Sequence, residues 1–289
     1  MKALAEFILR GRFQAFTVAL IGNFFPFIGQ AAIGLVSLSK GVAQGFWVFM
    51  WVSLPLVLMH YISADNPLLI TLSIASLGLM VVTAGMHKAL ASWQWTILTA
   101  MVVSSVVALS CGLLMQVHIE TLISQVKEFL SEISSGQNQT SVQLVMTEPM
   151  LLGLVAMILS AGSIISLMIS RWWQSLIHNP GGFQNEFHSF KIESKIAVVL
   201  VVVTLAGILL PKEYQFWVQM VAMPLVLAGI ALIHFAVKLQ NLGGHWLLLL
   251  YVTLLLFATK VAVFIIVLAV ADSFLDIRSR LVEHKNHKL

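Results

Sequence analysis

Two polar side chains inside long apolar runs are the residues of this chain best suited to bind a ligand. Lys260 lies in LLLLYVTLLLFATKVAVFIIVLAV, where an ammonium group is costly unless it meets an anion or water. It would anchor the carboxylate or phosphate of a small anionic or lipid-like ligand. His234, in GIALIHFAVK, would add a second polar contact, or would instead hydrogen-bond a neighbouring helix.

The remaining polar residues form no pattern typical of catalysis. The sequence contains no Walker P-loop and no HExxH, G-x-S-x-G or CxxC motif. Its single cysteine, Cys111, lies in an apolar run and excludes both a cysteine metal cluster and a disulfide. No apolar run holds an Asp or Glu in its interior, which argues against an ion-coupled pump. We therefore expect that the protein is not an enzyme and that it has no catalytic residue, metal site or cofactor.

The composition places these residues in a membrane protein. Of the 289 residues, 59% are hydrophobic and only 10% are charged, whereas about a quarter of a soluble domain is charged. The mean hydropathy is +0.96, so that most of the outer surface must face the lipid bilayer. The net charge of +4 is interpreted as a topology signal and not as a nucleic-acid footprint.

The apolar residues gather in runs that approach or exceed the length of a membrane-spanning helix. Because these runs do not alternate in polarity, helices joined by short turns are the predicted architecture. We expect an all-α polytopic bundle of about eight spans in a single integral membrane domain, residues 1–289. The predicted spans are 13–38, 41–62, 67–86, 92–116, 149–174, 196–211, 217–237 and 246–271.

Two topologies are open, and they differ in whether the first and last runs cross the membrane or turn back. Eight simple crossings leave a weak excess of Lys and Arg on the inner side. The excess becomes strong if run 13–38 turns near Gly22, Asn23 and Pro26 and run 246–271 turns near Lys260. Lys260 would then lie at headgroup level, where snorkelling explains its charge. Both topologies place the two termini in the cytoplasm.

Residues 117–148 interrupt the apolar pattern with an acidic amphipathic helix and a polar loop. Apolar residues recur on one helical stripe of segment 117–134, and three glutamates lie on the other face. An acidic face is unsuited to the anionic inner leaflet, which favours the outer side. The helix would act as a lid, or would rest on the bundle or the lipid surface.

Residues 171–195, RWWQSLIHNPGGFQNEFHSFKIESK, predict an elbow: a helix exit, a sharp turn and a short interfacial helix. An arginine and two tryptophans suit the membrane boundary, and Asn-Pro-Gly-Gly ends the helix. Three phenylalanines then recur at helical spacing on one face. The elbow would either pin two spans or dock another membrane or cytosolic protein. Its candidate partner-facing residues are Arg171, Trp172, Trp173, Asn179, Pro180, Gly181, Gly182, Phe183, Phe187 and Phe190.

Four segments resemble YybS-like bacterial membrane proteins, a family of unknown function. The most specific is RWWQSLIHNPGGFQNEF, and the others are MKALAEFILRGRFQA, GIALIHF and ADSFLDIRSR. The resemblance implies an inner-membrane protein of a proteobacterium. It also implies a distant similarity to the S components of energy-coupling-factor transporters, which bind a small molecule and are driven by a separate ATPase module. The acidic insert at 117–148 and Lys260 lie outside that pattern.

Two functions remain open. The first is an S-component-like subunit of the bacterial inner membrane that binds or translocates a substrate without an energy source of its own. The second is a non-transporting scaffold or assembly factor, with the elbow and the acidic helix as docking surfaces. A small molecule retained in gently purified protein would favour the first function, and a stoichiometric protein partner would favour the second.

Overall fold

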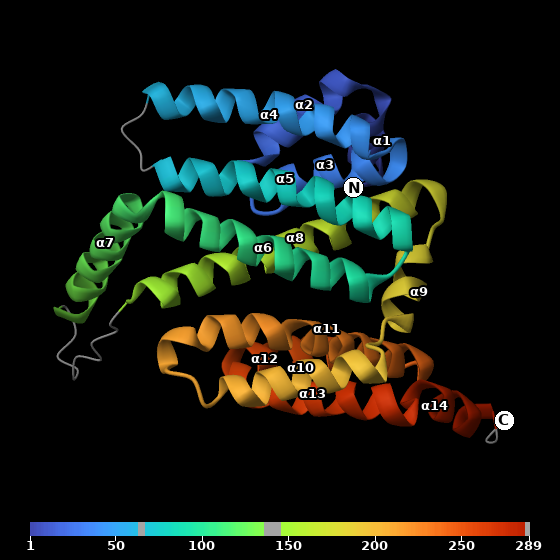
Figure 1. Ribbon diagram of the computed structural model, residues 1–289. Coiled ribbons are helices and arrows are strands. Elements are labelled where there is room, and N and C mark those ends of the chain that lie inside the picture. The colour runs from blue at the N-terminus through green and yellow to red at the C-terminus, as the bar shows by residue number, and fades with distance from the viewer. Residues whose placement is uncertain (63–66, 136–145, 287–289) are drawn as a thin grey trace. The chain divides into compact units, whose positions relative to one another are not determined.

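The structure, a computed structural model, describes residues 1–62, 67–135 and 146–286 (Figure 1). These residues form helices and no strands, which confirms the predicted all-α class. Most of the predicted polar loop, residues 136–145, lies outside the described residues. The elements are α1 (Lys2–Arg10), α2 (Arg12–Gly22), α3 (Ile28–Lys40), α4 (Val42–Ile62), α5 (Pro67–Leu90), α6 (Trp93–Leu114), α7 (Gln116–Ser135), α8 (Glu148–His178), α9 (Gly182–Ser189), α10 (Ser194–Gly207), the 3-10 turn η1 (Lys212–Tyr214), α11 (Gln215–Leu239), α12 (His245–Leu256), α13 (Ala258–Leu275) and α14 (Ile277–Asn286).

The helices form two compact units. The first comprises Met1–Pro180 with Leu210–Met220, and the second comprises Gly181–Leu209 with the residues from Val221 onward. Helix α11 begins in the first unit and continues in the second.

Six described helices are long and apolar enough to cross a membrane: α4, α5, α6, α8, α11 with its preceding turn, and α13. They coincide with predicted apolar runs, and α10 and α12 are shorter apolar helices. The chain therefore has the fold of a helical membrane protein. Helices α2 and α3 come from the first apolar run, and α12 and α13 come from the last; both of these runs are broken.

The first apolar run is a helical hairpin. Helices α2 and α3, of 11 and 13 residues, pack against each other on either side of the turn 23–27. Phe27 adopts a left-handed φ of 68° at the start of α3. A Cβ on Gly22 would lie 2.8 Å from the backbone nitrogen of Gly29, so both glycines are needed for this close approach. The turn predicted near Gly22, Asn23 and Pro26 is confirmed.

The last apolar run is also interrupted. Helix α12 ends at Leu256 and α13 begins at Ala258, with Phe257 in a non-helical conformation between them. The two helices contact each other. The break at Phe257 lies three residues before Lys260, near which the sequence predicts a turn.

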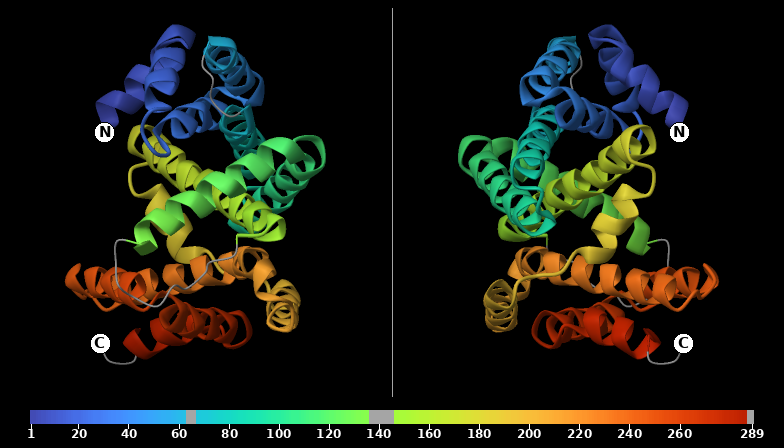
Figure 2. Two further views of the ribbon diagram at one scale, coloured as in Figure 1. Left: turned by 90° about the vertical axis from the view of Figure 1, so that its left-hand side faces the viewer. Right: turned by 90° about the vertical axis from the view of Figure 1, so that its right-hand side faces the viewer.

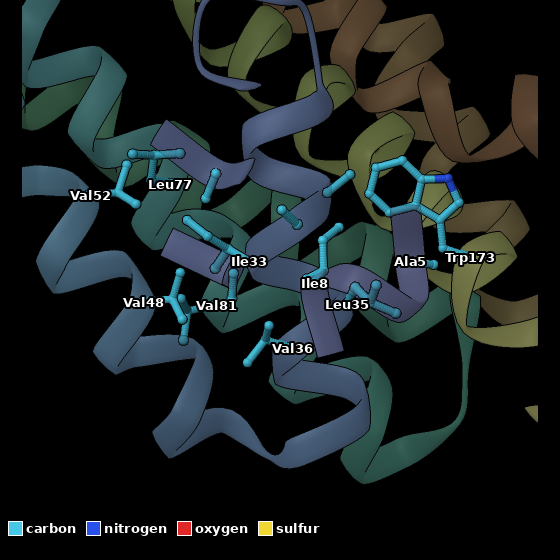
Figure 3. Packing of buried hydrophobic residues seen from close by; sticks show 14 residues of the cluster. Ala5, Ile8, Ile33, Leu35, Val36, Val48, Val52, Leu77, Val81 and Trp173 are labelled. Atoms are coloured by element: carbon cyan, nitrogen blue, oxygen red, sulfur yellow. The ribbon is translucent and has the colours of Figure 1, made fainter. Parts of the chain in front are cut away.

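The core of the first unit surrounds α3. Ile33 and Leu35 are fully buried and pack with residues of α1, α4, α5 and α8 (Figure 3). Small residues on α8 allow close packing, because a Cβ on Gly153 would lie 2.6 Å from the Trp217 ring and Ser163 hydrogen-bonds Thr83 at 3.0 Å.

Helix α7 lies across the ends of α5, α6 and α8 (Figures 1 and 2). Ile119 anchors it, since this side chain is fully buried in a cluster with Leu68, Cys111 and Met150. Glu120, on the predicted polar face, is exposed. The predicted amphipathic helix is therefore present and rests on the helical bundle.

Candidate functional site

Lys260 lies at the surface and not inside a helix bundle. It is exposed in the first turn of α13, three residues after Phe257. No hydrogen bond or ion pair joins it to His234 or to any other described residue. The two candidate ligand-binding residues are therefore not brought together, and Lys260 lies beside a break in the helix as the second topology expects.

His234 connects helices within the second unit. Its Nε2 and the Tyr251 hydroxyl of α12 are 2.9 Å apart and form a hydrogen bond. Its ring also meets the edge of Phe187 of α9, with 5.4 Å between ring centroids. Of its two predicted roles, the structure displays the hydrogen bond to a neighbouring helix.

The N-terminal part of the predicted elbow belongs to the end of α8. Arg171 donates a hydrogen bond from Nη1 to Gln174 Oε1 at 2.6 Å, and Trp172 is 39% exposed. Trp173, however, is only 1% exposed and packs against Ala5 and Ile8 of α1 (Figure 3). The Trp173 side chain therefore belongs to the core although that of Trp172 is exposed, because successive side chains point about 100° apart around a helix.

The turn after α8 is followed by α9. Asn179 and Pro180 leave the helical conformation, and Gly181 adopts a left-handed φ of 86° that favours glycine. Gly182, the first residue of α9, is buried.

The aromatic face of α9 makes contacts inside the second unit. Phe183 stacks on Phe187, and Phe190 is 6% exposed. His188 of the same helix meets the edge of the Phe235 ring on α11. Phe187, His188 and Phe190 of the elbow are thus used for packing within the protein.

An ion pair that sequence reasoning missed lies beside α9. Arg278 Nη1 is 2.9 Å from Asp272 Oδ2, and Arg278 Nη2 donates a hydrogen bond to the Phe190 carbonyl at 2.7 Å. The Asp272 carboxylate also accepts the backbone N–H of Arg278 at 3.3 Å. Both residues are buried. Helix α13 extends to Leu275, so Asp272 is an acidic residue inside a helix whose predicted run ended at residue 271.

A second clamp joins the same segments. Lys191 Nζ is 3.1 Å from Asp276 Oδ1, and the Ser194 hydroxyl donates to the Ser273 carbonyl at 2.6 Å. Hydrogen bonds from Ser279 and Lys191 hold the pKa of Asp276 below its ordinary value. The connector 190–193 is therefore fixed to the α13–α14 junction. The spacing of Asp and Arg in ADSFLDIRSR was the available signal for this cluster, but sequence alone does not reveal its partners.

A cavity of about 530 Å³ lies at the turn of the α2–α3 hairpin in the first unit. No charged side chain lines it. Its polar lining consists of two amides and two hydroxyls, and three phenylalanines of the turn supply aromatic surface. The lining residues are Gly22, Asn23, Phe24, Phe25, Pro26, Phe27, Gly29, Gln30, Leu69, Leu72, Ser73, Ser76, Ile158, Leu159 and Gly162.

Hydrogen bonds behind this cavity orient its amide. Ser166 of α8 donates to Gln30 Oε1 at 2.8 Å, which leaves the two N–H donors of the Gln30 amide for other partners. Ser170 donates to the Ala31 carbonyl at 2.9 Å and ties α3 to α8. The turn residues were recognised in the sequence for their effect on topology, but nothing in the sequence indicated that they border a cavity.

No protein-family model, curated protein or solved structure matches this chain. Among the described residues, no group of three or more His, Cys, Asp or Glu side chains is arranged to hold a metal ion. What the geometry offers is an uncharged cavity at a broken helix and a set of ion pairs that fix one connector. The cavity is suited to binding a small molecule, whereas the ion pairs stabilise the fold.

Proposed function

We propose that this protein is a membrane subunit that binds or translocates a small molecule and has no energy source of its own. The observation that carries the proposal is the cavity at the α2–α3 turn. Its volume of about 530 Å³ lies within the range of about 300–1,000 Å³ that is typical of small-molecule sites. Its lining also has the usual character of such sites, apolar and aromatic walls with a few polar groups.

The broken helix adds backbone donors to this cavity. The first intrahelical bond of α3 runs from the Ala31 nitrogen to the Phe27 carbonyl. The N–H groups of Ile28, Gly29 and Gln30 therefore have no acceptor within the helix, and the last two residues line the cavity. Membrane transporters place interrupted helices at their substrate sites for this reason, since the free backbone groups bind the ligand.

The lining chemistry favours a neutral ligand. Asn23 and Gln30 supply amides, and Ser73 and Ser76 supply hydroxyl oxygens. Both serine hydroxyls already donate to carbonyls of α5, so they offer acceptor lone pairs. A small uncharged molecule with hydrogen-bonding groups and an apolar body suits this lining better than the anion for which Lys260 was considered.

The cellular setting is part of the same proposal. A bacterial inner-membrane location, with both termini in the cytoplasm, fits the YybS-like segments and their distant similarity to S components. Such a subunit would need a partner protein to supply energy. Support for the orientation comes from the hairpin, which brings Lys40 to the same cavity as Arg12 and so gathers cations at one end of the first unit.

Filling the cavity tests the proposal. A Cβ on Gly162 would meet only the Phe27 ring, at 3.9 Å, so Gly162→Leu should enter the cavity without a backbone clash. Protein purified in mild detergent from bacterial membranes is denatured, and the released small molecules are identified by mass spectrometry. We expect the native chain to release a neutral molecule in near-stoichiometric amount, and Gly162→Leu to release at least tenfold less.

Gly244→Leu is the matched control, because a Cβ there meets nothing within 4 Å and the residue does not line the cavity. It should release the same molecule in the same amount as the native chain. Equal retention by Gly162→Leu, or the absence of any stoichiometric molecule from the native chain, would contradict the proposal.

A non-transporting scaffold is the second candidate function, and α7 is the observation that favours it. Phe129 is 62% exposed and Val117 is 72% exposed on this acidic helix, although Ile119 anchors it. Such a surface suits a protein partner. The scaffold would be favoured if a protein co-purifies in stoichiometric amount with the native chain and is lost in Phe129→Ser. The native chain should then contain no bound small molecule.

A further inference from the structure

A second cavity lies at the other end of the α2–α3 hairpin, away from the turn. It has a volume of about 150 Å³, and its polar lining comes from α2, α3 and α4. The complete lining is Gly11, Arg12, Ala15, Val36, Lys40, Gln44 and Val48. Two of these side chains are cationic and none is a carboxylate.

The guanidinium of this cavity is held in a fixed orientation. Arg12 Nε donates to Gln44 Oε1 at 2.9 Å, which leaves the N–H groups of both terminal nitrogens for another acceptor. No described carboxylate forms an ion pair with Arg12 or with Lys40. A third cation lies nearby, since a Cβ on Gly41 would be 4.0 Å from Lys88 Nζ.

An apolar cavity adjoins the cationic one. It has a volume of about 50 Å³ and is lined by Arg12, Phe16, Trp47, Val48 and Trp51. Arg12 and Val48 belong to both linings, so the cationic and aromatic surfaces are continuous. The two tryptophans, one helical turn apart on α4, are more than half exposed. Tryptophan is enriched at the boundary between hydrocarbon and headgroups.

We propose that the cationic cavity binds the phosphate of an anionic phospholipid, whose acyl chain lies along the adjoining aromatic surface. Arginine presents paired donors that match a phosphate, and lysine adds a point charge. The exposed indoles cover the part of an acyl chain next to its headgroup. A free inorganic phosphate would make the same contacts with the cations, but it has no acyl chain to contact the tryptophans. This site is independent of the proposed function, because its lining shares no residue with the cavity at the turn.

Lipid retention tests the site. The full chain is reconstituted into nanodiscs that contain equal amounts of phosphatidylglycerol and phosphatidylcholine, extracted into mild detergent, and analysed by native mass spectrometry. We expect one phosphatidylglycerol to be retained in preference to phosphatidylcholine. Each interfacial cation contributes roughly a fivefold preference. Arg12→Gln combined with Lys40→Gln should therefore reduce the preference about 25-fold.

The charge-matched control is Lys127→Gln combined with Lys212→Gln, which removes two exposed cations outside both cavities. It should retain phosphatidylglycerol as the native chain does. Helical content by circular dichroism verifies that each variant is folded. If the double variant does not fold, the exposed side chain of Lys40 alone is changed, and Lys40→Arg should retain the lipid while Lys40→Gln loses about fivefold.

Two further arms separate the sources of the phosphate. Excess inorganic phosphate should leave the bound phosphatidylglycerol in place, and Trp47→Ala with Trp51→Ala should weaken its retention. If inorganic phosphate displaces the phosphatidylglycerol and the tryptophan changes have no effect on its retention, the site binds a free anion and not a lipid, and the proposal is overturned. Equal retention of the two lipids, or an equal loss in the control variant, would also overturn it.

Discussion

At the scale of single residues, the charges of the second unit serve its fold. Arg278 joins three segments through one guanidinium, because it pairs with Asp272, donates to the Phe190 carbonyl and lies 5.9 Å from the centre of the Phe235 ring. Burial lowers the pKa of Arg278, while the carboxylates of Asp272 and Asp276 raise it. A buried pair of this kind is costly to break because the remaining charge has no partner.

Arg278→Ala should therefore destabilise the protein strongly. The change leaves the buried carboxylate of Asp272 without its cation, which costs about 3–5 kcal/mol. Thermal unfolding in detergent, followed by the loss of monodisperse protein, measures the effect. Arg280→Ala is the matched control, since this arginine is exposed on the same helix, and it should change the midpoint little. A similar midpoint for both variants would show that the ion pair does not hold the α13–α14 junction.

His188 should make the second unit sensitive to mild acid. Burial first, then the nearby charges of Lys238 and Arg278, lower the pKa of His188 below its ordinary value. The unfolded chain therefore takes up a proton at a higher pH than the folded chain. Stability from this residue is fully present above pH about 6.5 and is lost as the pH falls toward the folded pKa.

The thermal midpoint of the native chain should therefore fall more between pH 7.5 and 5.5 than that of His188→Gln. The other histidines remain in both proteins, so the difference between the two slopes reports His188 together with its electrostatic effect on His234. Identical slopes would contradict the assignment.

At the scale of elements, the α2–α3 hairpin positions both cavities. Its turn borders the cavity proposed for the small molecule, and its other end carries the cations proposed for the phospholipid. The hairpin depends on contact between backbones, since a Cβ on Gly29 would lie 2.8 Å from the Ala19 carbonyl oxygen. Helices approach this closely only through glycine or other small residues.

Gly29→Ala should separate the two helices and destabilise the chain by about 1–3 kcal/mol, as overpacking does in other cores. Gly162→Ala is the control, because its Cβ would make only an ordinary contact at 3.9 Å with a ring. The thermal midpoint should fall in the first variant and stay close to that of the native chain in the second. An unchanged midpoint in Gly29→Ala would mean that the hairpin tolerates a wider spacing.

At the scale of the molecule, three cations of the first unit lie near one end of its helices and the glutamates of α7 near the other. Leu68, at the beginning of α5, belongs to the cluster that anchors the acidic helix α7, and Lys88 lies near its end. These positions are 20 residues apart, or roughly 30 Å along a helix, which is the thickness of the hydrocarbon layer. Arg12, Lys40 and Lys88 gather at one end and the glutamates of α7 belong to the other.

This separation predicts the sidedness of single cysteines. In a chain with Cys111→Ala, Glu128→Cys should react with a membrane-impermeant maleimide in intact spheroplasts. Lys40→Cys and Lys88→Cys should react only after the membrane is opened, because positive residues favour the cytoplasmic side. Labelling of Lys40→Cys and Lys88→Cys from opposite sides would contradict the hairpin. Complete reversal of the pattern would contradict the cytoplasmic termini.

The amino-acid sequence by itself determined the helical class, the apolar runs and the turns that break the first and last of them. These properties are local, because hydropathy and turn preference act over a few residues along one segment. Predicted and observed ends agree closely, as for run 41–62 and α4, Val42–Ile62.

Only the tertiary structure decided which polar groups meet. Lys191 and Asp276 are 85 residues apart, and Ser166 and Gln30 are 136 residues apart. No periodicity within a segment encodes such pairs, because they depend on how separate helices pack. For the same reason Trp173, which suits a membrane boundary by its residue type, is a core side chain. The cavity at the α2–α3 turn likewise exists only because α5 and α8 close around residues whose sequence indicated no more than a turn.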